Sequence, residues 1–325
     1  MYLVSKDKLK FLLVVFIVTI IVFNINIYLS PDYEVYKSNW NNLESLDYSE
    51  FLWSLLHLIS KKIIFGNNYN FFLFFISLLI IYFKFKFLKD LVNSNLILIF
   101  YSSSFLVLHE SIQIRLAFGI LFVLKSIISS RENKGFKSWF FLCLASLVHL
   151  SLIFFIIVKL IGNIVKNKVF FLFTILCIVF IFRFISSQEN LLLLIEFFSQ
   201  IGEEWSLKLS KYLYDFLELS SVKSLPLQIY YVGLTYLIYL VFNFNKKFDL
   251  INELILISFI LIIPVLMIPS DTITSRLIEL CFYFLPFIQY YIVKEFFKQR
   301  HITLSLTILF ILFILNLKMF TNQLL

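Results

Sequence analysis

The chain has 325 residues, of which 61% are hydrophobic, 19% aromatic and only 15% charged, and its formal net charge is +8. A soluble domain of this length could not bury so much apolar surface, which excludes a soluble globular protein. The positive charge does not indicate nucleic acid binding, because the lysines occur in short clusters between apolar runs. The composition predicts a single integral membrane domain over residues 1–325, with no nucleic acid partner.

The first apolar run extends from Phe11 to Ile27 and follows Lys6, Lys8 and Lys10. This pattern is typical of a signal peptide, but no small-x-small cleavage site follows it. We therefore expect it to be retained as the first transmembrane helix.

Three cysteines, Cys143, Cys177 and Cys281, lie singly within apolar runs. None belongs to a Cys-x-x-Cys or Cys/His pattern, so we expect neither a disulfide framework nor a metal site.

The basic clusters predict which loops face the cytoplasm, by the positive-inside rule. Six clusters are expected on that side: Lys6/Lys8/Lys10, Lys84/Lys86/Lys89, Arg131/Lys134/Lys137, Lys159/Lys166/Lys168, Lys246/Lys247 and Lys294/Lys298/Arg300. Two acidic segments, about 30–69 and 188–227, are then the outer loops.

The fold class predicted from this pattern is an all-α polytopic membrane protein with about ten transmembrane helices, each about twenty residues long. The expected spans are residues 9–29, 70–88, 94–109, 112–130, 138–160, 168–187, 228–244, 251–269, 275–296 and 302–320.

The fifth of these segments, residues 138–160, breaks the alternation of sides. A straight crossing would place Lys166 and Lys168 outside. A broken or re-entrant helix that bends near His149 and returns would keep every basic cluster cytoplasmic. Irregular backbone at membrane depth is tolerated where it is buried in protein or lines a cavity, so this interpretation predicts a cavity beside His149. A straight span with misplaced lysines is the alternative.

The outer loops have distinct patterns. Within residues 30–69, a helix lying in the membrane interface is predicted by the spacing of Phe51, Leu52, Leu55, Leu56, Ile59 and Ile63, with Trp53 and His57 beside them. Residues 188–227 mix carboxylates with Trp205, Tyr212 and Tyr214. That mixture suits sugar binding, and it suits interface anchoring equally well.

The densest group of polar residues lies in residues 109–115, at the outer junction of the third and fourth spans. His109 and Gln113 would lie one turn apart on a helix, and Glu110 and Arg115 bracket that turn. Such a group presents an anion-binding face.

Only five of the 28 basic residues are arginines. In so lysine-rich a chain, Arg115 and Arg276 suggest that the bidentate guanidinium is required, with phosphate as its ligand. The alternative is an arginine that snorkels to the interface, or that pairs with Glu110 or Glu279.

Two stretches resemble the EpsG-type branch of Wzy-like polysaccharide polymerases. The first is Gln113-Ile114-Arg115-Leu116-Ala117, and the second is residues 147–153, which contain His149 and Ser151. The chain departs from the family pattern at two positions, Leu116 after the arginine and Leu152 three residues past the histidine. Early outer-loop residues and Arg276 at the start of a late span also match the family layout.

The resemblance implies a metal-independent glycosyltransferase without a cofactor, in the bacterial cytoplasmic (inner) membrane, with its active site facing outward. It would join oligosaccharide repeat units carried on undecaprenyl diphosphate, amid membrane lipid and in partnership with a flippase and a chain-length regulator. The catalytic residues implied are His149, Arg115 and Arg276, and the substrate-binding residues that match the family layout are Asp32, Tyr36, Glu50 and Gln113. His109 and Glu110 are further predicted substrate-binding residues, taken from the anion-binding group at residues 109–115.

Two other classes remain open at this point. A transporter or flippase of lipid-linked oligosaccharides would be longer and built from paired repeats, which the sequence does not show. A membrane acyltransferase that modifies surface glycans would require its His and Arg residues to be accessible from the cytoplasm. Motifs of soluble enzymes are absent from the sequence: it has no Gly-rich phosphate loop, no His-Glu-x-x-His and no Gly-x-Ser-x-Gly.

Overall fold

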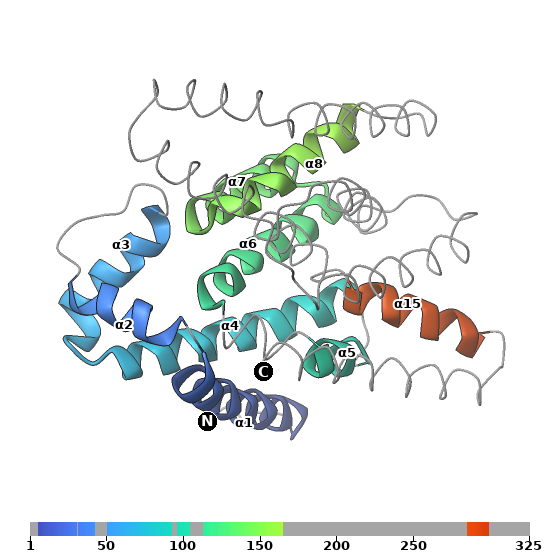
Figure 1. Ribbon diagram of the computed structural model, residues 1–325. Coiled ribbons are helices and arrows are strands. Elements are labelled where there is room, and N and C mark those ends of the chain that lie inside the picture. The colour runs from blue at the N-terminus through green and yellow to red at the C-terminus, as the bar shows by residue number, and fades with distance from the viewer. Residues whose placement is uncertain are drawn as a thin grey trace, which may run out of the picture. The chain divides into compact units, whose positions relative to one another are not determined.

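In the computed structural model of the protein, the residues described are 6–30, 32–42, 51–92, 96–104, 113–164 and 285–298. Within these ranges every regular element is helical and no strand occurs (Figure 1). Residues 1–157 together with 301–325 form one compact unit, and residues 158–300 form another. The expectation of an all-α protein is confirmed for this part of the chain.

The elements of the first unit follow one another in short succession. They are α1 (Lys6–Leu29), α2 (Tyr33–Asn41), α3 (Phe51–Ile59), the π-helix η2 (Ser60–Phe65), α4 (Tyr69–Val92), α5 (Leu96–Ser104), α6 (Ile114–Arg131), α7 (Gly135–Val148) and the 3-10 turn η4 (Leu150–Leu152). Helix α8 (Ile153–Ile164) begins in this unit, and α15 (Leu285–Lys298) belongs to the other.

Helices α1 and α4 are long and apolar enough to cross a membrane. They confirm the helices expected at residues 9–29 and 70–88, and α5, α6 and α7 begin near the next three expected spans. Helix α1 exposes mostly leucine, isoleucine and phenylalanine along its length, as a helix in contact with lipid does. The expected spans 168–187, 228–244, 251–269 and 302–320 lie outside the described residues.

Ring contacts fix the directions of α1 and α4. Phe11 contacts Tyr82, and Phe23 contacts Phe74, with ring centroids 5.9 and 5.5 Å apart, so the two helices are antiparallel. Helix α6 runs parallel to α4, because Arg131 at its end donates a hydrogen bond to the carbonyl of Leu91, 2.6 Å away, at the end of α4.

The two ends of this bundle therefore differ in chemistry. One end, called here the lysine-rich end, carries Lys8, Lys10, Lys86, Lys89, Arg131, Lys134 and Lys137. The other, called the aromatic end, is formed by α2, α3 and the first turns of α4 and α6. The aromatic end also carries Lys37, Lys61, Lys62 and Arg115, so the two ends differ by an excess of lysine and arginine at the lysine-rich end, which is the bias that the positive-inside rule describes.

The three lysines of the Lys84/Lys86/Lys89 cluster differ in burial. Lys86 and Lys89 are exposed, whereas Lys84 is fully buried. Its ammonium lies 5.6 Å from the centre of the Tyr101 ring on α5, within the range of a cation–π contact. The cytoplasmic side expected for this cluster stays a prediction, and the structure adds that the helical period turns Lys84 toward α5.

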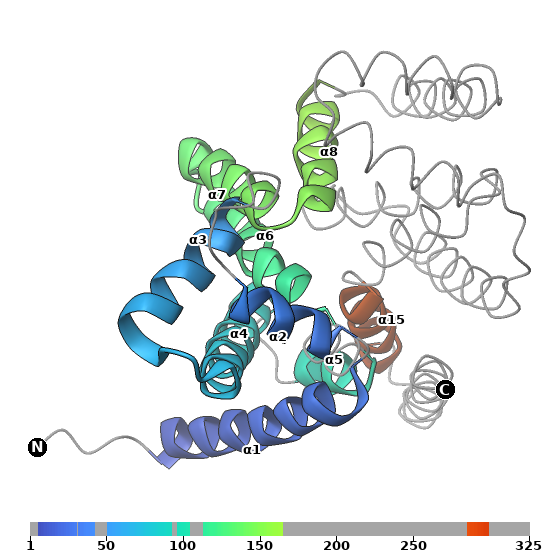
Figure 2. The same cartoon turned by 60° about the vertical axis from the view of Figure 1, so that its left-hand side comes forward.

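Helices α6 and α7 form an antiparallel hairpin (Figure 2). Near the turn, Ser126 and Ser138 exchange hydrogen bonds, each hydroxyl donating to the other residue's backbone carbonyl at 2.8 Å. Toward the aromatic end, Gly119 permits close approach: a Cβ there would collide with Leu152 and would lie 3.5 Å from the carbonyl of Ala145. Small residues at such crossings let two backbones approach.

Helix α7 ends at Val148, and His149 adopts an extended backbone with φ −149° and ψ 120°. The 3-10 turn η4 follows at once, and α8 begins after it. The predicted break near His149 is thus confirmed. That the chain then returns to the same side of the membrane stays a prediction.

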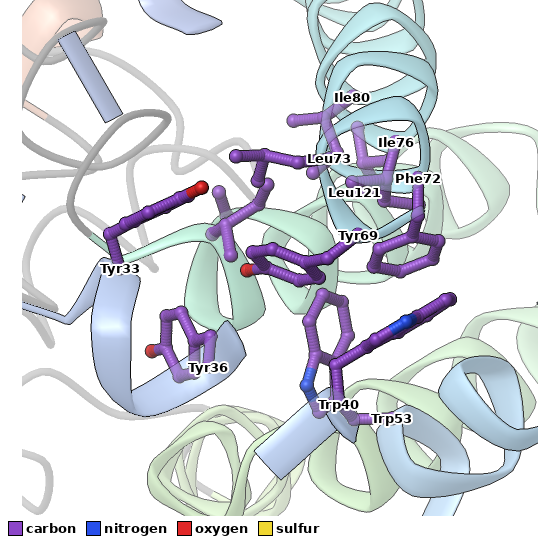
Figure 3. Close-up of a cluster of buried hydrophobic side chains, with 12 residues drawn as sticks. Tyr33, Tyr36, Trp40, Trp53, Tyr69, Phe72, Leu73, Ile76, Ile80 and Leu121 are labelled. Atoms are coloured by element: carbon purple, nitrogen blue, oxygen red, sulfur yellow. The ribbon is translucent and has the colours of Figure 1, made fainter. Parts of the chain in front are cut away.

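Helices α2 and α3 cover the aromatic end. Trp40 is stacked on Phe72 with ring centroids 4.7 Å apart, and aromatic rings from α2, α3 and α4 face one another in a single cluster (Figure 3). The helix predicted from residue 51 onward is present as α3 and η2. Its buried side carries Trp53 and His57, whereas its isoleucines, such as Ile63, are exposed.

The contact of Gly119 with Leu152 can be tested by a double-mutant cycle. We expect Gly119→Val to destabilise the protein by about 1–3 kcal/mol through overpacking. Leu152→Ala should cost about 2–5 kcal/mol through the cavity that it leaves. In the double variant the valine methyls would occupy that cavity, so its loss should be smaller than the sum when unfolding is measured in detergent. Strictly additive losses would contradict the contact.

Candidate functional site

The aromatic end brings together two predicted site residues that are 79 positions apart. The Arg115 side chain, in the first turn of α6, donates from its Nε to the hydroxyl of Tyr36 on α2 at 3.1 Å. The guanidinium carbon also lies 4.9 Å from the centre of the Tyr36 ring. One aromatic side chain thus holds the cation both by its π face and by its oxygen.

Helix α2 is attached to the rest of the bundle by polar contacts as well as by its rings. The Tyr33 hydroxyl donates to the side-chain oxygen of Asn70 at 2.6 Å. The ammonium of Lys61 donates to the carbonyls of Trp40 and Asn41 at 2.7 and 2.9 Å. A cation at the last carbonyls of a helix satisfies acceptors that have no partner in the helix itself. Tyr36 is therefore carried by a helix whose two ends are both tied down.

Asp32 occupies the N-cap position of α2. Its carbonyl accepts a hydrogen bond from the amide of Tyr36 at 2.9 Å, and its side chain makes no capping hydrogen bond. The structure thus places this predicted substrate-binding residue one turn before Tyr36, with a half-buried carboxylate.

Gln113 directly precedes α6 and is buried, with 9% of its surface exposed. Its carbonyl accepts from the amide of Ala117 at 2.9 Å, which begins the helix. Gln113 and Arg115 therefore flank the amino end of α6. A helix amino terminus favours negative charge through its unpaired amides and its dipole. The predicted anion-binding face, which also includes His109 and Glu110 outside the described residues, stays a prediction.

His149 lies at the same end of the α6–α7 hairpin as Arg115. Gly119, one turn after Arg115, approaches Leu152 and the Val148 side chain next to His149. One helical turn is a rise of about 5.4 Å. The antiparallel packing therefore places the two predicted catalytic residues on one level of the bundle.

The His149 ring is held by the turn that follows it. Its Nδ1 accepts a hydrogen bond from the amide of Ser151 at 3.3 Å and lies 2.8 Å from the Ser151 hydroxyl. An amide N–H can only donate, so Nδ1 must present its lone pair, and the neutral ring then carries its proton on Nε2. In this arrangement Nε2 is a hydrogen-bond donor.

Other predicted site residues lie outside the described residues. They are Glu50, His109, Glu110 and Arg276, and the outer segment 188–227 with its aromatic residues and carboxylates is outside as well. Among the described residues, no group of three or more His, Cys, Asp or Glu side chains has a geometry that could hold a metal ion.

His57 belongs to this end of the bundle, although it was not predicted as a site residue. Its ring lies 4.6 Å from that of Trp53 and 5.4 Å from that of Trp40, measured between centroids. Burial, and next the charge of Arg115, lower the pKa of His57 from 6.5 to about 3. The only sequence signal was Trp53 and His57 one turn apart in an outer segment.

The pKa of His57 makes the stability of the fold depend on pH. Because the pKa of His57 is lower in the folded state, protons bind preferentially to the unfolded chain. The contribution of neutral His57 to the free energy of unfolding is therefore fully present above pH 6.5 and is lost as the pH falls toward 3. The loss in the free energy of unfolding should be on the order of 1 kcal/mol per pH unit below 6.5. We expect the melting temperature of the purified protein to fall between pH 7.5 and 5 more steeply than that of His57→Leu. Parallel curves would show that His57 does not titrate in this way.

The chain was also compared with known proteins. The model of the EpsG family matches residues 9–324, nearly the whole chain. No curated protein and no solved structure matches it.

Proposed function

The chain is a member of the EpsG family of Wzy-like polysaccharide polymerases, and from that premise we propose that it joins lipid-linked oligosaccharide repeat units at the outer face of the bacterial cytoplasmic membrane. The donor would be a growing glycan on undecaprenyl diphosphate, and the acceptor a sugar hydroxyl of a new lipid-linked repeat unit. The observation that carries the proposal is Arg115, held over Tyr36 at the amino end of α6.

The charge that develops in this reaction suits that site. The acceptor oxygen forms a bond to the anomeric carbon while the bond from that carbon to the diphosphate oxygen breaks, and the acceptor proton is released. The leaving diphosphate gains negative charge. A guanidinium fixed before the reaction stabilises such charge without reorganising, above all where water is excluded. Arg276 would add a second cation, as the sequence predicts.

His149 has a definite role in this proposal. With Nδ1 bound to Ser151, its Nε2–H is a hydrogen-bond donor, and we assign it to an oxygen of the leaving diphosphate or of the donor sugar. Removal of the acceptor proton would then fall to a carboxylate, for which the half-buried Asp32, one turn before Tyr36, and Glu50 are the candidates.

The distribution of charge supports the outward orientation. The positive-inside rule assigns the lysine-rich end to the cytoplasm, which turns the aromatic end and Arg115 outward. Lipid-linked repeat units would meet the site there after they have been flipped across the membrane. A membrane acyltransferase with a cytoplasmic acyl donor would need the opposite orientation.

Complementation of a gene deletion tests the reaction, with surface glycan length measured on a gel. The matched pair is Arg115→Lys and Arg131→Lys, one arginine at each end of α6. Lysine keeps the charge but loses the planar fork, so Arg115→Lys should reduce long glycan at least tenfold, a change of about 1.4 kcal/mol. Arg131→Lys changes a residue at the lysine-rich end, where Arg131 contacts the carbonyl of Leu91, and should restore the ladder.

The outcomes separate the function classes. Deletion should leave single repeat units at the surface, and His149→Ala should behave as the deletion does. Absence of any surface glycan would favour a flippase instead. A full ladder in the deletion strain would remove the polymerase assignment.

Orientation is tested separately by labelling with a membrane-impermeant maleimide. In a background with Cys143, Cys177 and Cys281 replaced by serine, we expect Lys37→Cys on α2 to react in intact cells. Lys137→Cys, at the lysine-rich end, should react only after the membrane is permeabilised. The reverse pattern would place Arg115 in the cytoplasm and would favour the acyltransferase.

A further inference from the structure

Three polar atoms are buried beside the predicted site without being satisfied. They are Nε1 of Trp40, Nε2 of His57 and Oε1 of Gln113, and none has a hydrogen-bond partner within the part of the chain that the structure describes. The exposed fractions of the three side chains are 0%, 2% and 9%. Buried polar atoms are nearly always paired, so three of them in one region require an explanation.

The three residues come from different elements near Arg115: Ile114, which follows Gln113, belongs to the same buried cluster as Trp40 and Trp53. Trp40 ends α2, His57 lies on α3, and the two rings are 5.4 Å apart in an edge-on arrangement. Gln113 stands two residues before Arg115, whose charge acts on His57. Figure 3 shows Trp40 among the rings that line this region.

Their hydrogen-bonding capacities identify the kind of ligand. The indole N–H of Trp40 only donates, the amide oxygen of Gln113 only accepts, and Nε2 of a neutral histidine does either one, according to its tautomer. A phosphate, which only accepts, would be repelled by the Gln113 oxygen. Hydroxyl groups donate and accept at once, so a polyhydroxylated ligand satisfies all three atoms.

We propose that Trp40, His57 and Gln113 form a sugar subsite next to Arg115, in which hydroxyl groups of the substrate pair with these three atoms. The subsite rests on the proposed function, which supplies a sugar linked to a diphosphate. The anionic group would lie at Arg115, and the adjoining ring would displace the Trp40 ring from the face of Phe72, on which it is stacked in this structure. Aromatic faces pack well against the C–H faces of sugars.

In this structure neighbouring side chains bury the three polar atoms, so a bound sugar must displace some of those side chains. Helix α2 carries Trp40 and is held at that end by Lys61. Because α2 also holds Tyr36 against Arg115, the displacement must be confined to the side chains of Trp40 and His57.

The test compares shape-preserving substitutions that remove only the polar atom. Gln113→Met and His57→Leu do this in the subsite, and Ser77→Ala does it at a control position on α4. The Ser77 hydroxyl is equally buried and unpartnered within the described residues, two turns after Tyr69. Replacing an unsatisfied polar atom by an apolar one is neutral or stabilising. All three variants should therefore melt in detergent at or above the wild-type temperature.

Activity should separate the subsite from the control. We expect Gln113→Met and His57→Leu to reduce long surface glycan at least tenfold and to accumulate single repeat units, while Ser77→Ala restores the normal ladder. His57→Gln, whose side-chain amide again supplies a donor and an acceptor, should recover part of the activity.

Two results would overturn the subsite. Full ladders from both Gln113→Met and His57→Leu would show that these atoms bind nothing needed for the reaction. Loss of glycan together with a lower melting temperature, or with less protein in the membrane, would make the residues structural. Arg115→Lys assayed in parallel separates the two hypotheses. If Arg115→Lys also gives the full ladder, the proposed function fails. If Arg115→Lys loses the ladder while Gln113→Met and His57→Leu keep it, only the subsite is wrong.

Discussion

The close approach of α6 and α7 at Gly119 sets the relative positions of the site residues in this fold. Without a Cβ at that position, the helix can lie against Ala145 and Leu152. The paired hydroxyls of Ser126 and Ser138 fix the other end of the crossing, so the hairpin has one register. That register puts Arg115 and His149 at the same level, although 33 residues and a turn separate them along the chain. A bulkier residue at Gly119 would move both ends of the site at once.

Arg115 needs a partner, because a guanidinium near membrane depth is costly unless it is held by other groups. Tyr36 supplies one without adding negative charge, through its ring face and its hydroxyl oxygen. A carboxylate there would neutralise the cation and compete with an anionic substrate. The tyrosine keeps the positive charge and orients it, and the attachments of α2 through Tyr33 and Lys61 carry that orientation to the rest of the bundle.

Sequence patterns predicted the helices well where one simple constraint governs them. Hydrophobic length alone predicted α1 and α4, and the imbalance of basic clusters predicted the break at His149. Tyr36 and Arg115 were assigned to a common site only through the family resemblance, because no local pattern indicates that two residues 79 positions apart will touch. Trp40 and His57 were missed for the same reason, since their burial arises from the packing of α2 and α3 on α4. The burial of Lys84 could not be predicted from its basic cluster either, because it arises from the packing of α4 against α5. Glu50, His109, Glu110 and Arg276 stay predictions.

The polar atoms around Arg115 make this end of the bundle less stable than the sequence could have made it. Each buried atom without a partner costs about 1–3 kcal/mol, and a whole domain is stable by only about 5–15 kcal/mol. Leucine or methionine at these positions would remove that cost. Apolar residues are common elsewhere in the chain, which is rich in leucine and phenylalanine. Burial also keeps His57 neutral, so this ring adds no second positive charge beside Arg115. A region arranged in this way gives up stability to retain one oriented charge beside neutral donors and acceptors, which is the combination that an anionic, hydroxyl-rich substrate requires.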